Sequence, residues 1–183
     1  MRYILVLTGA LHFGSLAIAQ NDGPTNVTPE MLQKIKAAVE IQVTKYRQGI
    51  AKKDYTADRV DFSVDTFRIE RIVAKRIEAD YSTMGTTEAV SDGTEAYDKL
   101  MNKYYNKLLK LLKPEDKKVL IAAQKAWLQF RDAEFKLIGI MGKDEYSGGG
   151  SIQSNIAVDT YSELIVKRTV DIFNYYDNAI KEK

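Results

Sequence analysis

Residues 114–138 read PEDKKVLIAAQKAWLQFRDAEFKLI. Pro114 suits the first position of a helix, and the two acidic residues that follow it, Glu115 and Asp116, suit the positive end of the helix dipole. Apolar side chains then recur at three- and four-residue spacing and predict one stripe along the helix: Val119, Leu120, Ala123, Ala126, Trp127, Phe130, Leu137 and Ile138. This stretch therefore predicts one long amphipathic helix.

The same periodicity extends over the rest of the chain. It predicts further helices from Thr28 to about Lys53, from about Asp58 to Tyr81, and from about Ile152 to Lys181. Another helix ends at Leu112 and begins either near Thr86 or beyond Gly93, because residues 82–94 are rich in Thr, Ser, Gly and Asp and mark an internal boundary. Residues 139–151 contain five glycines and predict an irregular loop. No run alternates with period two, so we expect an all-α bundle of about five helices.

The amino terminus resembles a secretory signal. Residues 1–19 combine Arg2, an apolar run and the small residues Ala17 and Ala19, which predicts cleavage after Ala19 and a short leader over residues 20–27. The protein is then exported, periplasmic or secreted, and it is not a lipoprotein because no cysteine follows the cleavage site. We expect no stable membrane insertion after cleavage. A formal net charge of only +2 over 183 residues argues against nucleic acid as a partner.

The composition excludes several kinds of chemistry. The chain has no cysteine, and its one histidine, His12, lies in the predicted signal. Thiol nucleophiles, Cys/His zinc sites, Ser-His-Asp triads and disulfides are therefore excluded from the processed chain, and no cofactor is expected. Asp132 and Glu134 point to different sides of a helix, and Asp159 and Glu163 share a face with Lys167 as ordinary surface pairs do. The residues thus predict a protein that is not an enzyme.

One polar strip is not required by the amphipathic pattern. Gln124, Trp127, Arg131 and Glu134 follow one another at intervals of three or four, so they share one side of the helix. Arg168 in the last helix is a second cation that could join them. We interpret the strip as a satisfied polar network that fixes helix packing, and direct contact with a ligand is the alternative.

This strip lies inside a longer motif. The stretch AAQKAWLQFRDAEF, Ala122 to Phe135, resembles the signature of the LprI-like family of small exported bacterial proteins, which is named for a lysozyme inhibitor. The resemblance covers about residues 86–176, and its further matching positions are Asp98, Asn102, Tyr105, Asp132, the Gly149-Gly150-Ser151 turn and Arg168. It implies a three-helix LprI-like domain over residues 86–181, preceded by a helical hairpin over residues 28–82 that has no counterpart in the family.

The resemblance also implies a function. LprI-like proteins usually carry disulfide cysteines, and their places here are Phe135 and about Thr160, so packing replaces the covalent link. The implied activity is non-enzymatic binding of a protein partner, such as a lysozyme. The glycine loop is the candidate binding surface, through Lys143, Tyr146, Ser147, Gly149, Gly150 and Ser151. A structural or scaffold module of the cell envelope, docking a partner on its first two helices, is the alternative, and a carboxylate-based glycan-active enzyme is the least favoured.

Overall fold

The protein is described by a computed structural model that covers residues 23–53 and 55–181. Six helices make up this part of the chain: α1 (Pro29–Ile50), α2 (Ala57–Ala79), α3 (Thr83–Leu111), α4 (Pro114–Met141), α5 (Asp144–Ser147) and α6 (Ile152–Lys181). The all-α prediction is confirmed, and the helix count rises by one because the four-residue α5 lies inside the predicted glycine loop. The predicted signal, residues 1–19, lies outside the described residues.

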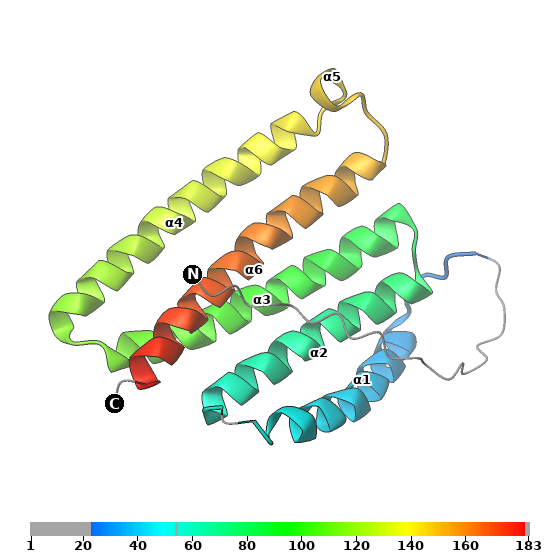
Figure 1. Cartoon of the computed structure of the whole chain (residues 1–183). Coiled ribbons are helices and arrows are strands. Elements are labelled where there is room, and N and C mark those ends of the chain that lie inside the picture. Colours follow the sequence, from blue (N-terminus) through cyan, green and yellow to red (C-terminus); the bar gives the residue numbers. More distant parts are fainter. Residues whose placement is uncertain (1–22, 54, 182–183) are drawn as a thin grey trace.

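The long helices lie roughly side by side, in an order that differs from their order in the chain. Figure 1 shows α3 and α6 at the centre, with α2 and then α1 on one side and α4 on the other. The α4–α5–α6 turn therefore projects at one end, away from α1 and α2. None of the described helices is long and apolar enough to cross a bilayer.

Short polar side chains set where the first three helices begin. The hydroxyl oxygen of Thr28 accepts the backbone N–H of Met31 at 3.2 Å, as predicted for the start of the first helix. Thr56 accepts the N–H of Arg59 at 3.2 Å, and Ser82 accepts the N–H of Gly85 at 3.0 Å. Each hydroxyl satisfies an N–H that the first helical turn leaves without a partner.

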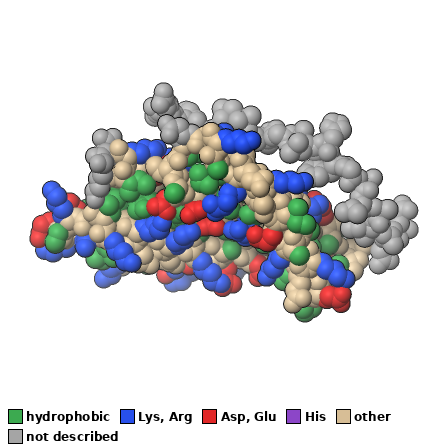
Figure 2. Space-filling view, turned by 90° about the horizontal axis from the view of Figure 1, so that it is seen from below, with side chains coloured by type: hydrophobic (Ala, Val, Ile, Leu, Met, Phe, Trp, Pro, Cys, Tyr) green, Lys and Arg blue, Asp and Glu red, His purple; other side chains and the backbone are tan. Residues whose placement is uncertain are grey.

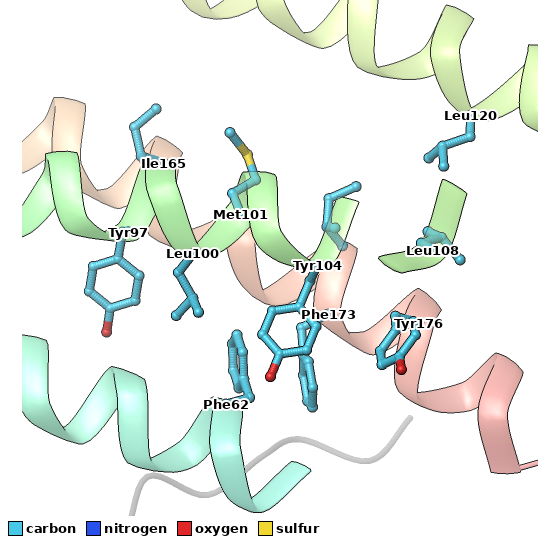
Figure 3. Close-up of a cluster of buried hydrophobic side chains, with 11 residues drawn as sticks. Phe62, Tyr97, Leu100, Met101, Tyr104, Leu108, Leu120, Ile165, Phe173 and Tyr176 are labelled. Carbon is cyan, nitrogen blue, oxygen red and sulfur yellow. The ribbon is translucent and has the colours of Figure 1, made fainter. Parts of the chain in front are cut away.

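An aromatic cluster fills the main core, between α2, α3 and α6 (Figure 3). The rings of Phe62 and Phe173 stack with their centroids 3.8 Å apart, and the ring of Tyr104 meets that of Phe173 edge-on at 4.9 Å. Tyr104 is fully buried, and its hydroxyl donates to the backbone oxygen of Asp58 at 3.0 Å. Side chains that are distant in the chain thus join α2, α3 and α6 at one place.

A smaller core holds α1 against α2. It consists of Val39, Val43, Ile50, Val60 and Val64. Ion pairs surround this core, including Arg68 Nε to Glu40 Oε1 at 2.6 Å and Arg47 Nη2 to Asp61 Oδ1 at 2.7 Å. Figure 2 shows how basic and acidic side chains intermingle on one face of the molecule, so that face carries no strong field of one sign.

The structure decides between the two predicted starts of the helix that ends near Leu112, because α3 begins at Thr83, close to the earlier start, and runs through Gly93 without a break. Its small residues serve a close helix contact and do not form a loop. Gly93 is buried, and a Cβ at this position would lie 2.5 Å from Cγ2 of Val73 on α2. Composition alone does not distinguish a helix that packs closely through small residues from a flexible linker.

Gly93→Ala is therefore expected to lower the free energy of unfolding by about 1–2 kcal/mol, because the added methyl overpacks the contact with Val73. Gly139→Ala is the matched control, since Gly139 is also helical but exposed, with nothing within 4 Å of its Cβ position. There the better helix propensity of alanine should stabilise the protein by up to about 1 kcal/mol. Urea unfolding of both variants measures the difference. Equal changes in the free energy of unfolding would contradict the close contact between Gly93 and Val73.

One charged residue of α2 is buried. The charges of residues 58–81 alternate in sign and predict a mostly solvated face that includes Arg76, yet the side chain of Arg76 is buried. Its guanidinium pairs with Asp92 on α3, whose carboxylate is largely exposed. This pair bridges α2 and α3, so its arginine is drawn into the interface between the two helices.

The apolar stripe predicted on residues 114–138 is divided between two faces of α4. Leu120 is buried and Trp127 is half-buried against the core, whereas Val119, Phe130 and Leu137 are exposed. Only Leu120 and Gln124 of α4 are buried. The helix therefore contacts the bundle along a narrow line and leaves the rest of its apolar stripe in solvent.

Candidate functional site

The polar strip on α4 faces α6. Gln124 is buried, and its side-chain oxygen accepts two hydrogen bonds from Arg168 of α6, from Nε at 3.0 Å and from Nη2 at 2.9 Å. The amide nitrogen of Gln124 lies 3.8 Å from the sulfur of Met101 on α3. Gln124 thus joins α4 to both central helices, and its contact with Met101 has no signal in the sequence.

Trp127 lies between two guanidinium groups. The Cζ atoms of Arg131 and Arg168 are each 5.6 Å from the centroid of its ring, which is within the range of cation–π attraction. Arg131 also pairs with the neighbouring Asp132, with Nη2 and Oδ1 2.6 Å apart. Gln124, Trp127 and Arg131 of the strip therefore come together in space with Arg168, and Asp132 joins them through Arg131.

The remaining signature residues lie elsewhere. Asn102 donates to the carboxylate of Asp98 at 3.1 Å one turn earlier on α3, and this pair makes no hydrogen bond to Gln124 or Arg168. Tyr105 is half-buried and packs against the main core. Glu134 is half-buried beside a cavity near the end of α4. The signature is thus spread over α3, α4 and α6.

A cavity of about 310 Å³ lies between α3, α4 and α6, next to Arg131 of the strip. Glu95 and Asp98 of α3 and Arg131 of α4 supply its charged groups, and Tyr161 of α6 lines it as well. Burial raises the pKa of Tyr161, and the nearby carboxylate of Asp98 adds to the rise although Arg131 opposes it. Glu95 is not among the site residues predicted from the sequence, because a single carboxylate on a helix surface has no pattern that distinguishes it.

An aromatic pair joins α4 and α6 near Phe135 and Thr160, the two positions that the resemblance assigns to cysteines. The rings of Phe135 on α4 and Tyr161 on α6 pack against each other, and Arg131 covers the Phe135 ring at 5.7 Å from its centroid. Tyr161 directly follows Thr160, the position matched to the second cysteine. The contact between the two rings therefore holds α4 and α6 together here, and Arg131 packs on it from within α4.

The turn between α4 and α6 is tightly organised. Gly148, Gly149 and Gly150 all have positive φ, at 77°, 79° and 94°, a conformation that favours glycine over other residues. The hydroxyl of Ser147 donates to the backbone oxygen of Lys143 at 3.0 Å and accepts the N–H of Gly149 at 3.1 Å. Ser147 is thus used within the turn, whereas Lys143, Tyr146 and Ser151 are exposed.

Exposed apolar side chains gather around this turn. They include Met141 at the end of α4, Tyr146 on α5, and Ile152 and Ile156 at the start of α6. The apolar periodicity of residues 152–181 predicts that Ile156 is buried, yet it is exposed because α6 extends past the main core at this end. A second cavity of about 240 Å³ opens between the two helices and is lined in part by Leu137, Met141 and Ile156. We call the surface formed by Lys143, Tyr146, Met141, Ile152 and Ile156 the tip.

Comparison with known proteins adds one finding. The family model described as lysozyme inhibitor LprI matches residues 75–171, more than half of the chain. The matched stretch begins near the end of α2 and includes α3, α4, the tip and most of α6. No curated protein and no solved structure matches the chain.

Proposed function

This chain belongs to the family of lysozyme inhibitor LprI, and from this premise we propose that it is an exported, non-enzymatic module that binds a lysozyme and blocks its cleft. The residues of the polar strip and of the tip all fall within the matched stretch. The signal-like pattern of residues 1–19 supports export to the compartment in which lysozymes attack the cell wall.

The observation that carries the proposal is the exposed apolar surface of the tip. Met141, Tyr146, Ile152 and Ile156 are all solvent-exposed at the projecting end of the molecule. Aromatic residues and methionine are enriched in protein interfaces, and a few such side chains supply most of the binding energy. A narrow projecting end with these side chains has the shape and chemistry to enter an enzyme cleft.

The tip also carries groups suited to a lysozyme cleft. Such a cleft holds two carboxyl groups that flank the scissile bond, one of them ionised. The ammonium group of Lys143 and the hydroxyl of Tyr146 are both exposed beside the braced glycine turn and can donate to these carboxylates. The hydrogen bonds of Ser147 hold the turn in one conformation, which lowers the entropy lost on binding.

The polar strip has a positioning role in this proposal. Gln124, Arg168 and Trp127 hold α4 in register with α6, and both helices lead directly into the tip. The strip therefore determines how the two ends of the glycine turn approach each other. It does so without touching the lysozyme.

Substitution at the tip tests the binding surface. The double variant Lys143→Ala/Tyr146→Ala is expected to weaken binding to lysozyme by at least about 30-fold, the effect of losing one strong hot spot of about 2 kcal/mol. Lys125→Ala/Tyr175→Ala is the matched control, because both of its residues are exposed and Tyr175 (57%) is as exposed as Tyr146 (54%). Isothermal titration calorimetry measures each affinity.

Two results would count against this proposal. Equal affinities of the two double variants would place the binding surface elsewhere on the molecule. Absence of binding by the unmodified chain would remove lysozyme as the partner and favour a scaffold role in the cell envelope.

A further inference from the structure

A second apolar surface runs along an exposed face of α4. It consists of seven residues, all exposed: Val119, Ala123, Ala126, Phe130, Ala133, Leu137 and Ile140. The four large side chains among them, Val119, Phe130, Leu137 and Ile140, are 70%, 52%, 49% and 43% exposed. We call this surface the α4 seam.

The spacing along the α4 seam alternates strictly between four and three residues. This is the heptad pattern of a coiled coil, in which Ala123, Phe130 and Leu137 occupy one core position and Val119, Ala126, Ala133 and Ile140 the other. When only these two positions of each heptad are apolar, the apolar strip is narrower than the face with which a helix packs into a globular core. The surface that fits this seam is therefore another helix.

We propose that the α4 seam binds the α4 seam of a second copy of this chain, with the two helices antiparallel. A two-fold axis passing beside Arg131 and Asp132 places Ala123 opposite Ile140, Ala126 opposite Leu137, and Phe130 opposite Ala133. Each of these layers pairs one small with one large side chain. Such alternation fills the space between two helices without voids.

The parallel arrangement fits less well. It would place Ala123 and Ala126 opposite their own copies and leave gaps, while Phe130 would crowd its counterpart. The exposed flank also agrees with the antiparallel register, because it brings Gln129 near Lys136 and so opposes no two like charges there. A formal net charge of only +2 creates little repulsion between two copies.

Pairing of this kind covers the part of α4 that the bundle leaves in solvent. Within its own chain α4 buries only Leu120 and Gln124. The antiparallel arrangement directs the two tips toward opposite ends of the dimer, so both stay available to partners. The inference rests on the α4 seam alone and does not depend on lysozyme binding.

Sedimentation velocity over a concentration series tests the association. The unmodified chain is expected to shift from monomer to dimer as concentration rises, and Phe130→Glu should raise the dissociation constant at least tenfold. Ile41→Glu is the matched control, since Ile41 on α1 is 64% exposed and lies outside the α4 seam. Circular dichroism checks that both variants keep their helices. A chain that stays monomeric at its highest soluble concentration, or a dimer insensitive to Phe130→Glu, would overturn the proposal.

Introduced cysteines test the register, because the natural chain has none. Under oxidation, a mixture of Ala126→Cys and Leu137→Cys chains should form a disulfide-linked heterodimer, since these positions are opposite each other in the antiparallel register. Each variant alone should form few links, because its two cysteines lie about 16 Å apart along the axis. Preferential linking of Ala126→Cys to itself would contradict the antiparallel register and indicate a parallel pair.

Discussion

Replacement of Tyr104 by alanine is expected to lower the free energy of unfolding by about 3–5 kcal/mol, the range measured for large aromatic residues truncated in cores. Tyr104 has no exposed surface and contacts the rings of Phe62, Phe173 and Tyr176. The substitution therefore opens a cavity where α2, α3 and α6 meet. It also removes the hydrogen bond from the Tyr104 hydroxyl to the backbone oxygen of Asp58.

Thermal and urea unfolding measure this loss, and the melting temperature should fall by about 10 °C. Tyr175→Ala is the control, because Tyr175 is 57% exposed on α6 and truncation there should change stability by less than about 0.5 kcal/mol. Similar losses for the two variants would show that the aromatic cluster is not the main core.

Asp177→Ala is expected to cost about 2–3 kcal/mol, because it leaves the positive charges around this carboxylate without their partner. The Asp177 side chain is fully buried on α6 and accepts hydrogen bonds from Arg59 and Thr56 at the start of α2. Lys181 also pairs with it at 2.7 Å. Arg59 and Lys181 keep some contact with water, which places the loss below the range for a fully buried pair.

The same carboxylate makes stability depend on pH. Burial alone would raise the pKa of Asp177, but hydrogen bonds from Arg59 and Lys181 outweigh it and lower the pKa below that of a free aspartate. The pKa of Asp58 is lowered in the same way, since burial is outweighed by Lys107 and Tyr176. A lowered folded-state pKa gives stability above the unfolded pKa of about 4, and this stability is lost as the pH falls through the folded value.

The free energy of unfolding should therefore decline below about pH 4 in the unmodified chain and decline less steeply in Asp177→Ala. Asp171→Ala is the matched control, because Asp171 also pairs with a lysine on α6, but its side chain is 36% exposed and that of Lys167 is 76% exposed. The free energy of unfolding of that variant should decline below about pH 4 as steeply as that of the unmodified chain. An equally steep decline in Asp177→Ala would contradict the role of the buried carboxylate.

The helical class and the polar strip were predictable because both depend on local geometry. Residues three and four apart share a helix face whatever surrounds the helix, so Gln124, Trp127 and Arg131 had to lie together. The same periodicity brought Arg168 to a side of α6 where it meets Gln124. The division of the chain into a hairpin over residues 28–82 and a domain over residues 86–181 stays a prediction.

Other features depend on which neighbour each face meets, and a periodic pattern does not contain this information. The apolar residues of α4 form one broad stripe in the sequence, yet Trp127 turns toward the bundle and Phe130 toward solvent. Gly93 lies in a stretch whose composition predicts a boundary, although it belongs to α3 and leaves no room for a Cβ beside Val73 of α2. The exposure of Ile156 could not be foreseen, because it follows from how far α6 extends beyond its neighbours.

Inhibition of lysozyme is tested most directly by the rate at which lysozyme clears a suspension of bacterial cell walls in the presence of the purified chain. If the tip blocks the cleft, the initial rate should fall in proportion to added chain and approach zero once the chain exceeds the enzyme and its dissociation constant. The tip variant Lys143→Ala/Tyr146→Ala should leave most of the rate intact at the same concentration. Undiminished lysis at a large molar excess of the unmodified chain would contradict the proposed function.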